Sequence, residues 1–140
     1  MKRKALNLDP RGWELPAWRK FFAVAACWNF GAALPVFALP DFHFRLYFGV
    51  KTIDEHARIL FLTFYAFVFL FGILYAMVAY NPPGNRNLVF AGILGKIYVT
   101  ILYNYMFLTG TASLFAALGG NGDFIFTLFF IYYLLKGPKE

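Results

Sequence analysis

Four long apolar stretches constrain the fold of this 140-residue chain more than any other feature. They cover residues 21–39, 59–80, 88–109 and 112–135, and each is close to the roughly 20 residues that a helix needs to cross a lipid bilayer. Hydrophobic residues make up 61% of the chain and charged residues only 14%. Soluble domains average about 45–50% apolar and about 25% charged residues. We therefore predict an integral membrane protein.

The bilayer also decides the secondary structure. Backbone N–H and C=O groups in lipid must be hydrogen-bonded within their own segment, so each span is predicted to be an α-helix. The spans use most of the chain and leave too few residues for a separate domain. We predict one all-α domain over residues 1–140: four transmembrane helices in an up-down bundle, with an interfacial N-terminal arm and a short interfacial segment on the outer side.

The net charge of +6 follows this topology. Nine basic residues fall on one side of the predicted membrane: Lys2, Arg3, Lys4, Arg11, Arg19, Lys20, Arg86, Lys136 and Lys139. Only Arg45, Lys51 and Arg58 fall on the other. The positive-inside rule places both termini in the cytoplasm, in the cell inner (plasma) membrane. We expect the basic arm to meet anionic lipids rather than nucleic acid.

A single lysine, Lys96, lies inside the third span. It lies about 12 Å from the cytoplasmic end of that span, and Asp123 lies about 18 Å from the same end of the fourth, at 1.5 Å per helical residue. A lysine side chain can bridge this difference in depth, and an unpaired charge at either position would cost at least about 3 kcal/mol. We predict a Lys96–Asp123 ion pair in the bundle interior.

Polar and small residues surround this predicted pair. In the third span they recur every fourth residue and so share one helix face. The candidate binding residues are Lys96, Thr100, Tyr103 and Asn104 in the third span, Asn121 and Asp123 in the fourth, and Asn29 in the first. Gly92 extends the face of the third span, and Gly120 and Thr127 align with Asp123 in the fourth.

The sequence "GGNG" at residues 119–122 interrupts the fourth span just before Asp123. A surface turn there would leave only 13 residues, about 20 Å of helix, which is too short to cross a bilayer. We therefore expect a kinked or locally unwound section inside the membrane. Glycines that allow two helices to pack closely are the alternative explanation.

Two interpretations of the charged centre stay open. In the first, the ion pair only fixes the register of two helices. In the second, it marks a site, since ionisable residues inside membranes usually mark a substrate or proton path and broken helices form the binding sites of many transporters. On the second interpretation the bundle centre binds or passes a small solute, ion or lipid-like molecule. The alternative function is a non-catalytic accessory subunit that packs against a larger membrane complex, for example a redox complex. A homo-oligomer is also compatible with the sequence.

Local signals predict where the helices begin and end. "TIDE" at residues 52–55 is a capping box in which Thr52 and Glu55 bond each other's backbone. Gly49 is expected to stop the outer interfacial segment, and Thr111 or Ser113 to cap the fourth span. Trp13 and Trp18 are typical interfacial anchors of the arm. Cys27, the sole cysteine, is expected to be a small core residue.

Several classes of site are disfavoured. No nucleophile–base set or glycine-rich phosphate loop is present, so we expect no enzyme activity and no cofactor. The acidic residues and histidines of the first loop, Asp41, His43, Asp54, Glu55 and His56, lack a recognisable metal-ligand spacing. Neither histidine lies within a span, which disfavours a bis-histidine haem. Aromatic residues such as Phe64, Phe67 and Phe71 are expected to face lipid or pack the bundle rather than line a pocket for a lipid or a quinone.

Two segments carry a resemblance to known proteins. "YNPPGNRNLVFAGILGKIYV" is a break that leads into a helix with two glycines and a lysine, and "GDFIFTLFF" begins with the aspartate of the last span. Together they resemble small four-helix bacterial membrane proteins of the DoxX-like kind. The resemblance implies a four-helix bundle with Lys96 and Asp123 as characteristic residues. Small multidrug exporters differ, since they carry a glutamate inside the first span, whereas Glu14 here precedes it.

Overall fold

The computed structural model describes residues 10–139 and is almost entirely helical within them. The elements are η1 (Pro10–Gly12), α1 (Leu15–Ala38), α2 (Pro40–Phe48), α3 (Glu55–Tyr80), η2 (Pro83–Asn85), α4 (Arg86–Leu108) and α5 (Leu114–Lys136). The four long helices α1, α3, α4 and α5 are each long and apolar enough to cross a membrane. The prediction of an all-α, four-helix membrane protein is confirmed.

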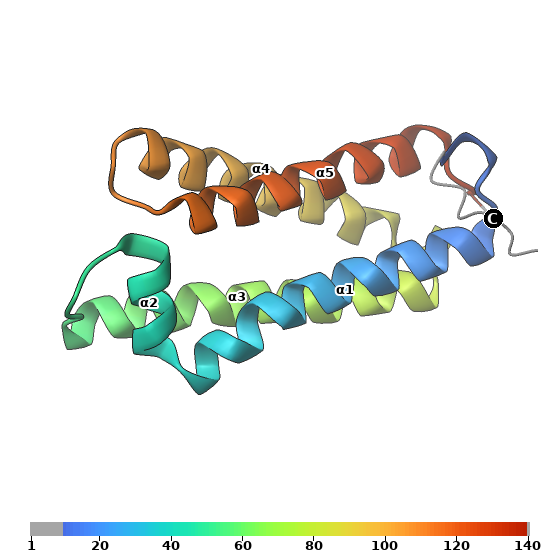
Figure 1. The fold of residues 1–140 in the computed structure, drawn as a ribbon. Helices are drawn as coiled ribbons and strands as arrows, with labels where there is room; N and C mark the ends of the chain where they lie inside the picture. The colour runs from blue at the N-terminus through green and yellow to red at the C-terminus, as the bar shows by residue number, and fades with distance from the viewer. Residues whose placement is uncertain (1–9, 140) are drawn as a thin grey trace, which may run out of the picture.

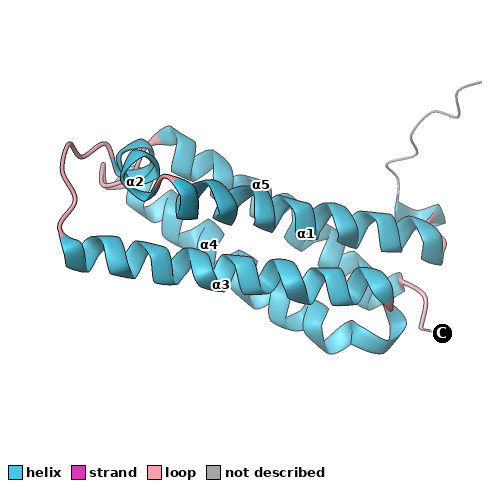
Figure 2. Cartoon of the chain, turned by 90° about the horizontal axis from the view of Figure 1, so that it is seen from below, coloured by secondary structure: helices cyan, strands magenta, loops and turns pink. Residues whose placement is uncertain are grey.

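The four long helices form two layers (Figure 1). Helix α1 packs along α3 in one layer, and α4 packs along α5 in the other. Figure 2 shows the same helices running alongside one another from a second direction. We call the end that carries α2 the α2 end, and the opposite end, which carries η1, η2 and the described C-terminal residues, the terminal end. Helix α2 contacts α1, α3 and α5, and so bridges the layers at its own end.

The first helix begins earlier than the predicted span. Helix α1 starts at Leu15 with Pro16 in its first turn, where the missing N–H of proline does no harm. Trp18 is consequently inside the helix and only 1% exposed, packed against Tyr133 and Phe22. The prediction that Trp18 anchors at the membrane surface is wrong. Of the predicted interfacial arm, residues 1–9 lie outside the described residues, and its last part, from Leu15 onward, belongs to α1.

The helix ends agree with the predicted signals at two of three places. Gly49 ends α2 with a φ of 69°, a left-handed conformation that favours glycine. The Ser113 side chain caps α5 by accepting from the Ala116 N–H. At α3, however, the cap is Asp54, whose side chain accepts from the Ala57 N–H. The prediction of a Thr52–Glu55 capping box is therefore wrong. That hydrogen bond lowers the pKa of the Asp54 carboxyl.

The predicted break in the fourth span is also wrong. Helix α5 is continuous from Leu114 to Lys136, including all of "GGNG". Two of its glycines instead lie where another chain segment comes very close. A Cβ on Gly120 would lie 3.2 Å from the Tyr103 Cβ of α4, and one on Gly122 would lie 2.5 Å from the Trp28 ring of α1. The glycines therefore serve close packing, the alternative explanation.

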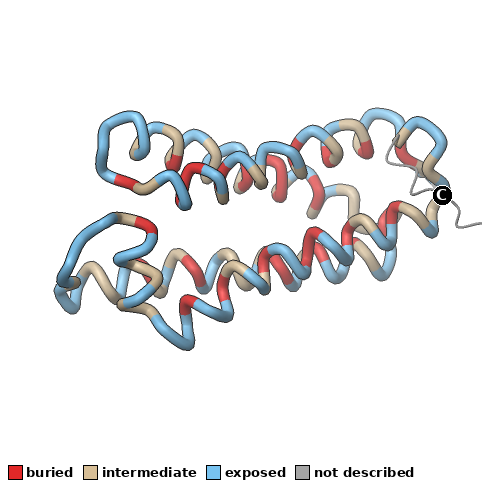
Figure 3. Tube along the Cα trace, viewed as in Figure 1, coloured by how far each residue is buried: buried red, intermediate tan, exposed pale blue. Residues whose placement is uncertain are grey.

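The buried side chains fall into two clusters, and Figure 3 shows the buried parts of the helices facing between the layers. The cluster at the terminal end contains Trp18, Phe22, Ala25, Ala26, Tyr75, Val78, Val89, Ile93, Phe130 and Tyr133. The cluster at the α2 end contains Ala33, Val36, Tyr47, Phe61, Tyr65, Tyr103, Ala112 and Ala116. The polar centre lies between them.

Arg86, at the start of α4, holds the terminal end together. Its guanidinium donates to the backbone oxygens of Tyr133, Leu134 and Pro138 and lies 5.0 Å from the centre of the Tyr133 ring. These carbonyls lie at and just beyond the last turn of α5, where helix carbonyls lack N–H partners from a following turn; the Tyr133 oxygen also accepts from the Gly137 N–H. Arg86 is thus a helix cap as well as a positive charge near the predicted membrane surface.

Candidate functional site

Lys96 and Asp123 meet in the middle of the bundle, as predicted. The Lys96 ammonium lies 2.5 Å from Asp123 Oδ1. The two side chains come from α4 and α5, whose tight packing brings them to the same depth. Their exposures differ: the lysine side chain is 4% exposed and the aspartate side chain 16%. The pair is therefore closed on the lysine side and partly open on the aspartate side.

The Lys96 ammonium is fully surrounded by groups that stabilise a positive charge. Besides Asp123, it donates to Asn29 Oδ1 of α1 over 3.2 Å. Asn29 is held in turn because its amide nitrogen donates to the Val68 backbone oxygen of α3. The ammonium also lies 5.2 Å and 5.1 Å from the ring centres of Tyr75 and Phe126, within cation–π distance. Residues of α1, α3 and α5 thus stabilise the one positive charge that α4 carries into the bundle centre.

Asp123 is less completely engaged. Its Oδ1 atom accepts from both Lys96 and the Trp28 indole N–H, the latter over 3.1 Å. Among the described residues, the structure gives no hydrogen bond to its second oxygen, Oδ2. An ionised carboxylate offers about four acceptor positions on its two oxygens. Asp123 therefore retains acceptor capacity with the ion pair intact.

A cavity of about 560 Å³ lies beside Asp123, between the two layers and toward the α2 end. All five α-helices line it. Most of its wall is apolar, from residues such as Ala32, Phe64, Val68, Val99 and Leu118. Among the described residues that line it, Asp123 is the only acidic one, and Lys96 is not part of the lining. The cavity thus meets the ion pair through the aspartate alone.

The opening of this cavity lies between α1 and α5. The lining residues that are exposed come only from these two helices: Cys27, Trp28, Gly31 and Pro35 of α1, and Phe115 and Leu118 of α5. The lining residues of α3 and α4 are buried or half-buried. Both rims are formed by predicted membrane spans, so in a bilayer the opening faces lipid rather than water.

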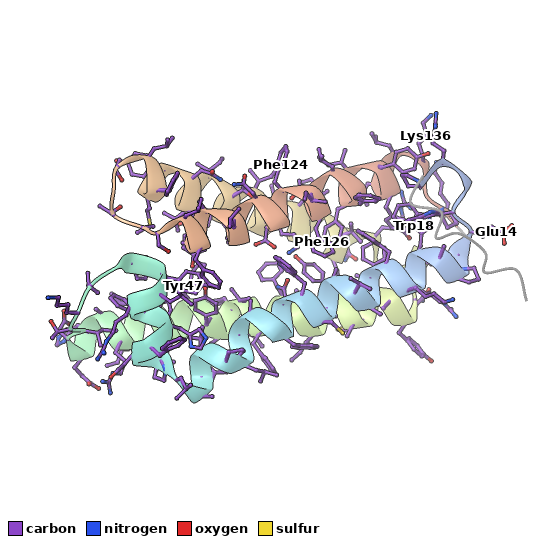
Figure 4. All side chains as sticks on the ribbon, in the orientation of Figure 1. Glu14, Trp18, Tyr47, Phe124, Phe126 and Lys136 are labelled. Atoms are coloured by element: carbon purple, nitrogen blue, oxygen red, sulfur yellow. The ribbon has the colours of Figure 1, made fainter. Side chains whose placement is uncertain are left out.

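Three tyrosines, Tyr47, Tyr65 and Tyr103, form a hydroxyl-bearing part of the cavity wall. The Tyr65 and Tyr103 hydroxyls lie 3.2 Å apart and are buried, and the Tyr47 ring centre lies 5.7 Å from each of their ring centres. Figure 4 shows Tyr47 between α2 and α5, and its side chain is part of the cavity lining. Burial raises the pKa of the Tyr47 phenol, so this group is a neutral donor and acceptor at physiological pH.

The other predicted site residues lie close to the pair but differ in what they contact. Tyr103 and Asn29 line the cavity with Asp123. Thr100 does not: its hydroxyl lies 2.8 Å from the backbone oxygens of Lys96 and Gly120 and joins α4 to α5. Asn104 and Asn121 bond each other at 3.4 Å and 3.3 Å, with Asn121 exposed and neither lining the cavity.

Trp28 and His43 were not among the predicted binding residues. Trp28 lies in the middle of a span, where its N–H has no water to bond and needs a protein acceptor, and this requirement is a usable sequence signal. His43 Nδ1 donates to the Leu39 oxygen at 2.9 Å, and the ring lines the cavity from α2. Its role had no sequence signal. Cys27 is exposed at the rim, so its predicted place in the core is wrong.

The acidic residues and histidines of the first loop do not converge. Asp41 pairs with Arg58 at 2.8 Å, Asp54 caps α3, and His43 bonds the backbone oxygen of Leu39, between α1 and α2. Within residues 10–139, no group of three or more His, Cys, Asp or Glu side chains is placed to hold a metal ion. The side chains of Asp41, His43 and Asp54 are thus engaged separately at the α2 end.

Comparisons of the chain with protein-family models, with curated proteins and with solved structures found no match. The resemblance to DoxX-like proteins stays a prediction.

Proposed function

We propose that this protein binds a small molecule in the cavity beside Asp123. The observation that carries the proposal is the asymmetry of the ion pair: Lys96 is sealed, while Asp123 lines a cavity of about 560 Å³ with one carboxylate oxygen unengaged. A pair that only fixed helix register would be served equally well by close packing on both sides. Cavities of roughly 300–1,000 Å³, mostly apolar with a few convergent polar groups, are typical of small-molecule sites.

We also propose that the protein resides in the inner (plasma) membrane with both termini in the cytoplasm. The support is the distribution of charge between the two ends of the bundle. At the terminal end, Arg19, Lys20, Arg86, Lys136 and Lys139 accompany η1 and η2. At the α2 end there are three basic residues. The positive-inside rule then assigns the terminal end to the cytoplasm.

Native mass spectrometry of the protein purified from membranes in a mild detergent tests the binding proposal. We expect a bound species of small-molecule mass on the wild-type protein. The variant Lys96→Met with Asp123→Leu should lose it, because this double change keeps the site neutral and removes the acceptor. The control, Asn104→Ala with Asn121→Ala, breaks another polar contact between α4 and α5 away from the cavity and should retain the species. Retention by both variants, or no bound species on the wild type, would contradict the proposal.

A second candidate is a non-catalytic accessory subunit of a larger membrane complex. One observation favours it: Asn121 is exposed in the middle of a predicted span, away from the cavity. A polar amide in contact with lipid is unfavourable, and a neighbouring helix would cover it. If the protein solubilised from its native membrane migrates alone or only with copies of itself, this candidate fails.

A further inference from the structure

The chemistry of the cavity also narrows the ligand class, and this step rests on the proposed function. We infer that the cavity takes a neutral apolar alcohol or phenol from the bilayer, with its hydroxyl donating to Asp123. Three features of the site lead to this class: the charge balance, the free acceptor and the position of the opening.

The charge balance excludes ionic ligands. Lys96 and Asp123 neutralise each other over 2.5 Å, and the described residues that line the cavity include no other Asp, Glu, Lys or Arg. An ammonium ligand would add an uncompensated positive charge inside the membrane. A carboxylate or phosphate ligand would lie against Asp123 while Lys96 is enclosed on the far side. A neutral ligand leaves the balance unchanged.

The free acceptor atom of Asp123 favours a ligand that carries a hydrogen-bond donor. Asp123 Oδ2 is the atom of the ion pair that can still accept a hydrogen bond, since Oδ1 already takes two. A hydroxyl donates one hydrogen bond, and bonds to an ionised acceptor are roughly twice as strong as neutral ones. An ether of the same shape would leave Oδ2 unpaired. The lone hydroxyl is therefore what distinguishes a ligand from the surrounding lipid chains.

The position of the cavity opening indicates that the ligand comes from the bilayer. The rim consists of apolar or small residues of α1 and α5, with Phe115 48% and Leu118 60% exposed. A molecule that is already dissolved in the bilayer reaches this rim without crossing the basic terminal end or the α2 end. Gly31 at the rim has no atom within 4 Å of the position of a Cβ, so nothing fills the entrance there.

Photoaffinity labelling in liposomes tests the inference. Four probes share one long alkyl chain with a diazirine and differ only in the head: a primary alcohol, its methyl ether, a primary ammonium and a carboxylate. We expect saturable labelling of α1 and α5 peptides by the alcohol, competed by the unlabelled alcohol. The ether should label about tenfold less, the effect expected from one hydrogen bond. Both ionic probes should also label less than the alcohol.

Matched variants check the acceptor and the entrance. Lys96→Met with Asp123→Asn keeps a carbonyl acceptor, whereas Lys96→Met with Asp123→Leu keeps none; labelling by the alcohol should fall to the level of the ether only in the second. Gly31→Trp should reduce labelling by obstructing the rim. Ala23→Trp, on an exposed part of α1 that does not line the cavity, should not.

The outcomes separate this inference from the proposed function. Equal labelling by alcohol and ether, or stronger labelling by an ionic probe, would overturn the ligand class while leaving a cavity that binds molecules. Unchanged labelling of Gly31→Trp would overturn entry from the bilayer. If no probe labels the cavity saturably, the inference is overturned, and the proposed function then depends on whether a bound species accompanies the purified protein.

Discussion

The terminal half and the α2 half of this bundle use the same kind of residue in opposite ways. At the terminal end, large aromatic side chains fill the space between the layers: Trp18, Phe22, Phe130 and Tyr133 are at most 1% exposed. At the α2 end, Tyr47, Tyr65 and Tyr103 stand around a cavity of about 560 Å³. The Lys96–Asp123 pair lies at the boundary. The difference suggests that one half provides stability and the other provides the site.

The orientation of aromatic side chains on α5 illustrates the same division. Phe126 lies between the layers near the ion pair, whereas Phe124 points away from α1, as Figure 4 shows. Phe126 covers the Lys96 ammonium at 5.1 Å and contacts the Trp28 ring. Phe124 is 47% exposed. Neighbouring phenylalanines on one helix thus serve the site and the membrane-facing surface, respectively.

The largest loss of stability is expected when the Lys96–Asp123 ion pair, which lies between the two halves, is disrupted. Lys96→Met alone leaves Asp123 without its cation in a nearly buried place and should destabilise the protein by about 3–5 kcal/mol. Lys96→Met with Asp123→Asn should recover much of this loss, because no charge remains unpaired. Reversible unfolding in mixed micelles measures both variants. Losses that simply add would show that the two groups do not interact.

A slightly smaller loss of stability should distinguish the packed terminal half from the α2 half with its cavity. Phe130→Ala removes a fully buried ring that contacts Phe22 and Tyr75, and should cost about 3 kcal/mol, since a cavity replaces packed atoms. Phe115→Ala, at the rim of the existing cavity, should cost less than about 1 kcal/mol, since little packing is lost. Unfolding midpoints give the comparison. Equal losses would remove the distinction between a packed half and an open half.

The glycines of α5 provide a third, smaller comparison. Gly122→Ala places a Cβ 2.5 Å from the Trp28 ring and should destabilise by about 1–3 kcal/mol, because the indole must move off Asp123. Gly119→Ala meets nothing within 4 Å and should be neutral or stabilising by up to about 1 kcal/mol, because alanine favours a helix. Trp28 emission should shift only in Gly122→Ala. The reverse ranking would mean that the helix is unwound at the glycines.

The smallest effect concerns the cap at the start of α3. Asp54→Ala should speed amide exchange of the first turn of α3, including Ala57, while Thr52→Ala should not. The folded-state pKa of Asp54 is lowered from 3.8 by the Ala57 N–H, so the cap stabilises at pH values above 3.8 and is lost as the pH falls through the lower folded value. Hydrogen exchange followed from pH 7 to below 3.8 checks this. Protection that depends on Thr52 instead would restore the capping box.

The sequence predicted the architecture and the central contact because both follow from the cost of polar groups in lipid. Span length determines the four helices, and two opposite charges at similar depth must pair. The ends of α2 and α5 followed from Gly49 and Ser113. The continuity of α5 could not be predicted, because glycine is compatible with both a break in a helix and a close approach of another segment. Only the neighbours Tyr103 and Trp28 decide between the two.

The cavity itself could not be predicted. It depends on how two layers separate at one end, and that separation comes from side-chain packing between segments far apart in the chain. Trp28 and Asp123 are 95 residues apart and are joined by one hydrogen bond. Trp18 was misplaced for a related reason: α1 begins at Leu15, six residues before the predicted span, which moves this ring from the expected surface into the core.

Infrared difference spectroscopy of the Asp123 carboxylate tests the central claim most directly, because it observes the atoms that are proposed to bind. The protein in liposomes is compared with and without a long-chain alcohol, and the Asp123 band is assigned with the Lys96→Met, Asp123→Asn variant. We predict an ionised carboxylate whose stretching band shifts when the alcohol binds, and no shift with the matched methyl ether. A band that neither compound shifts would mean that the pair is only a structural link between α4 and α5.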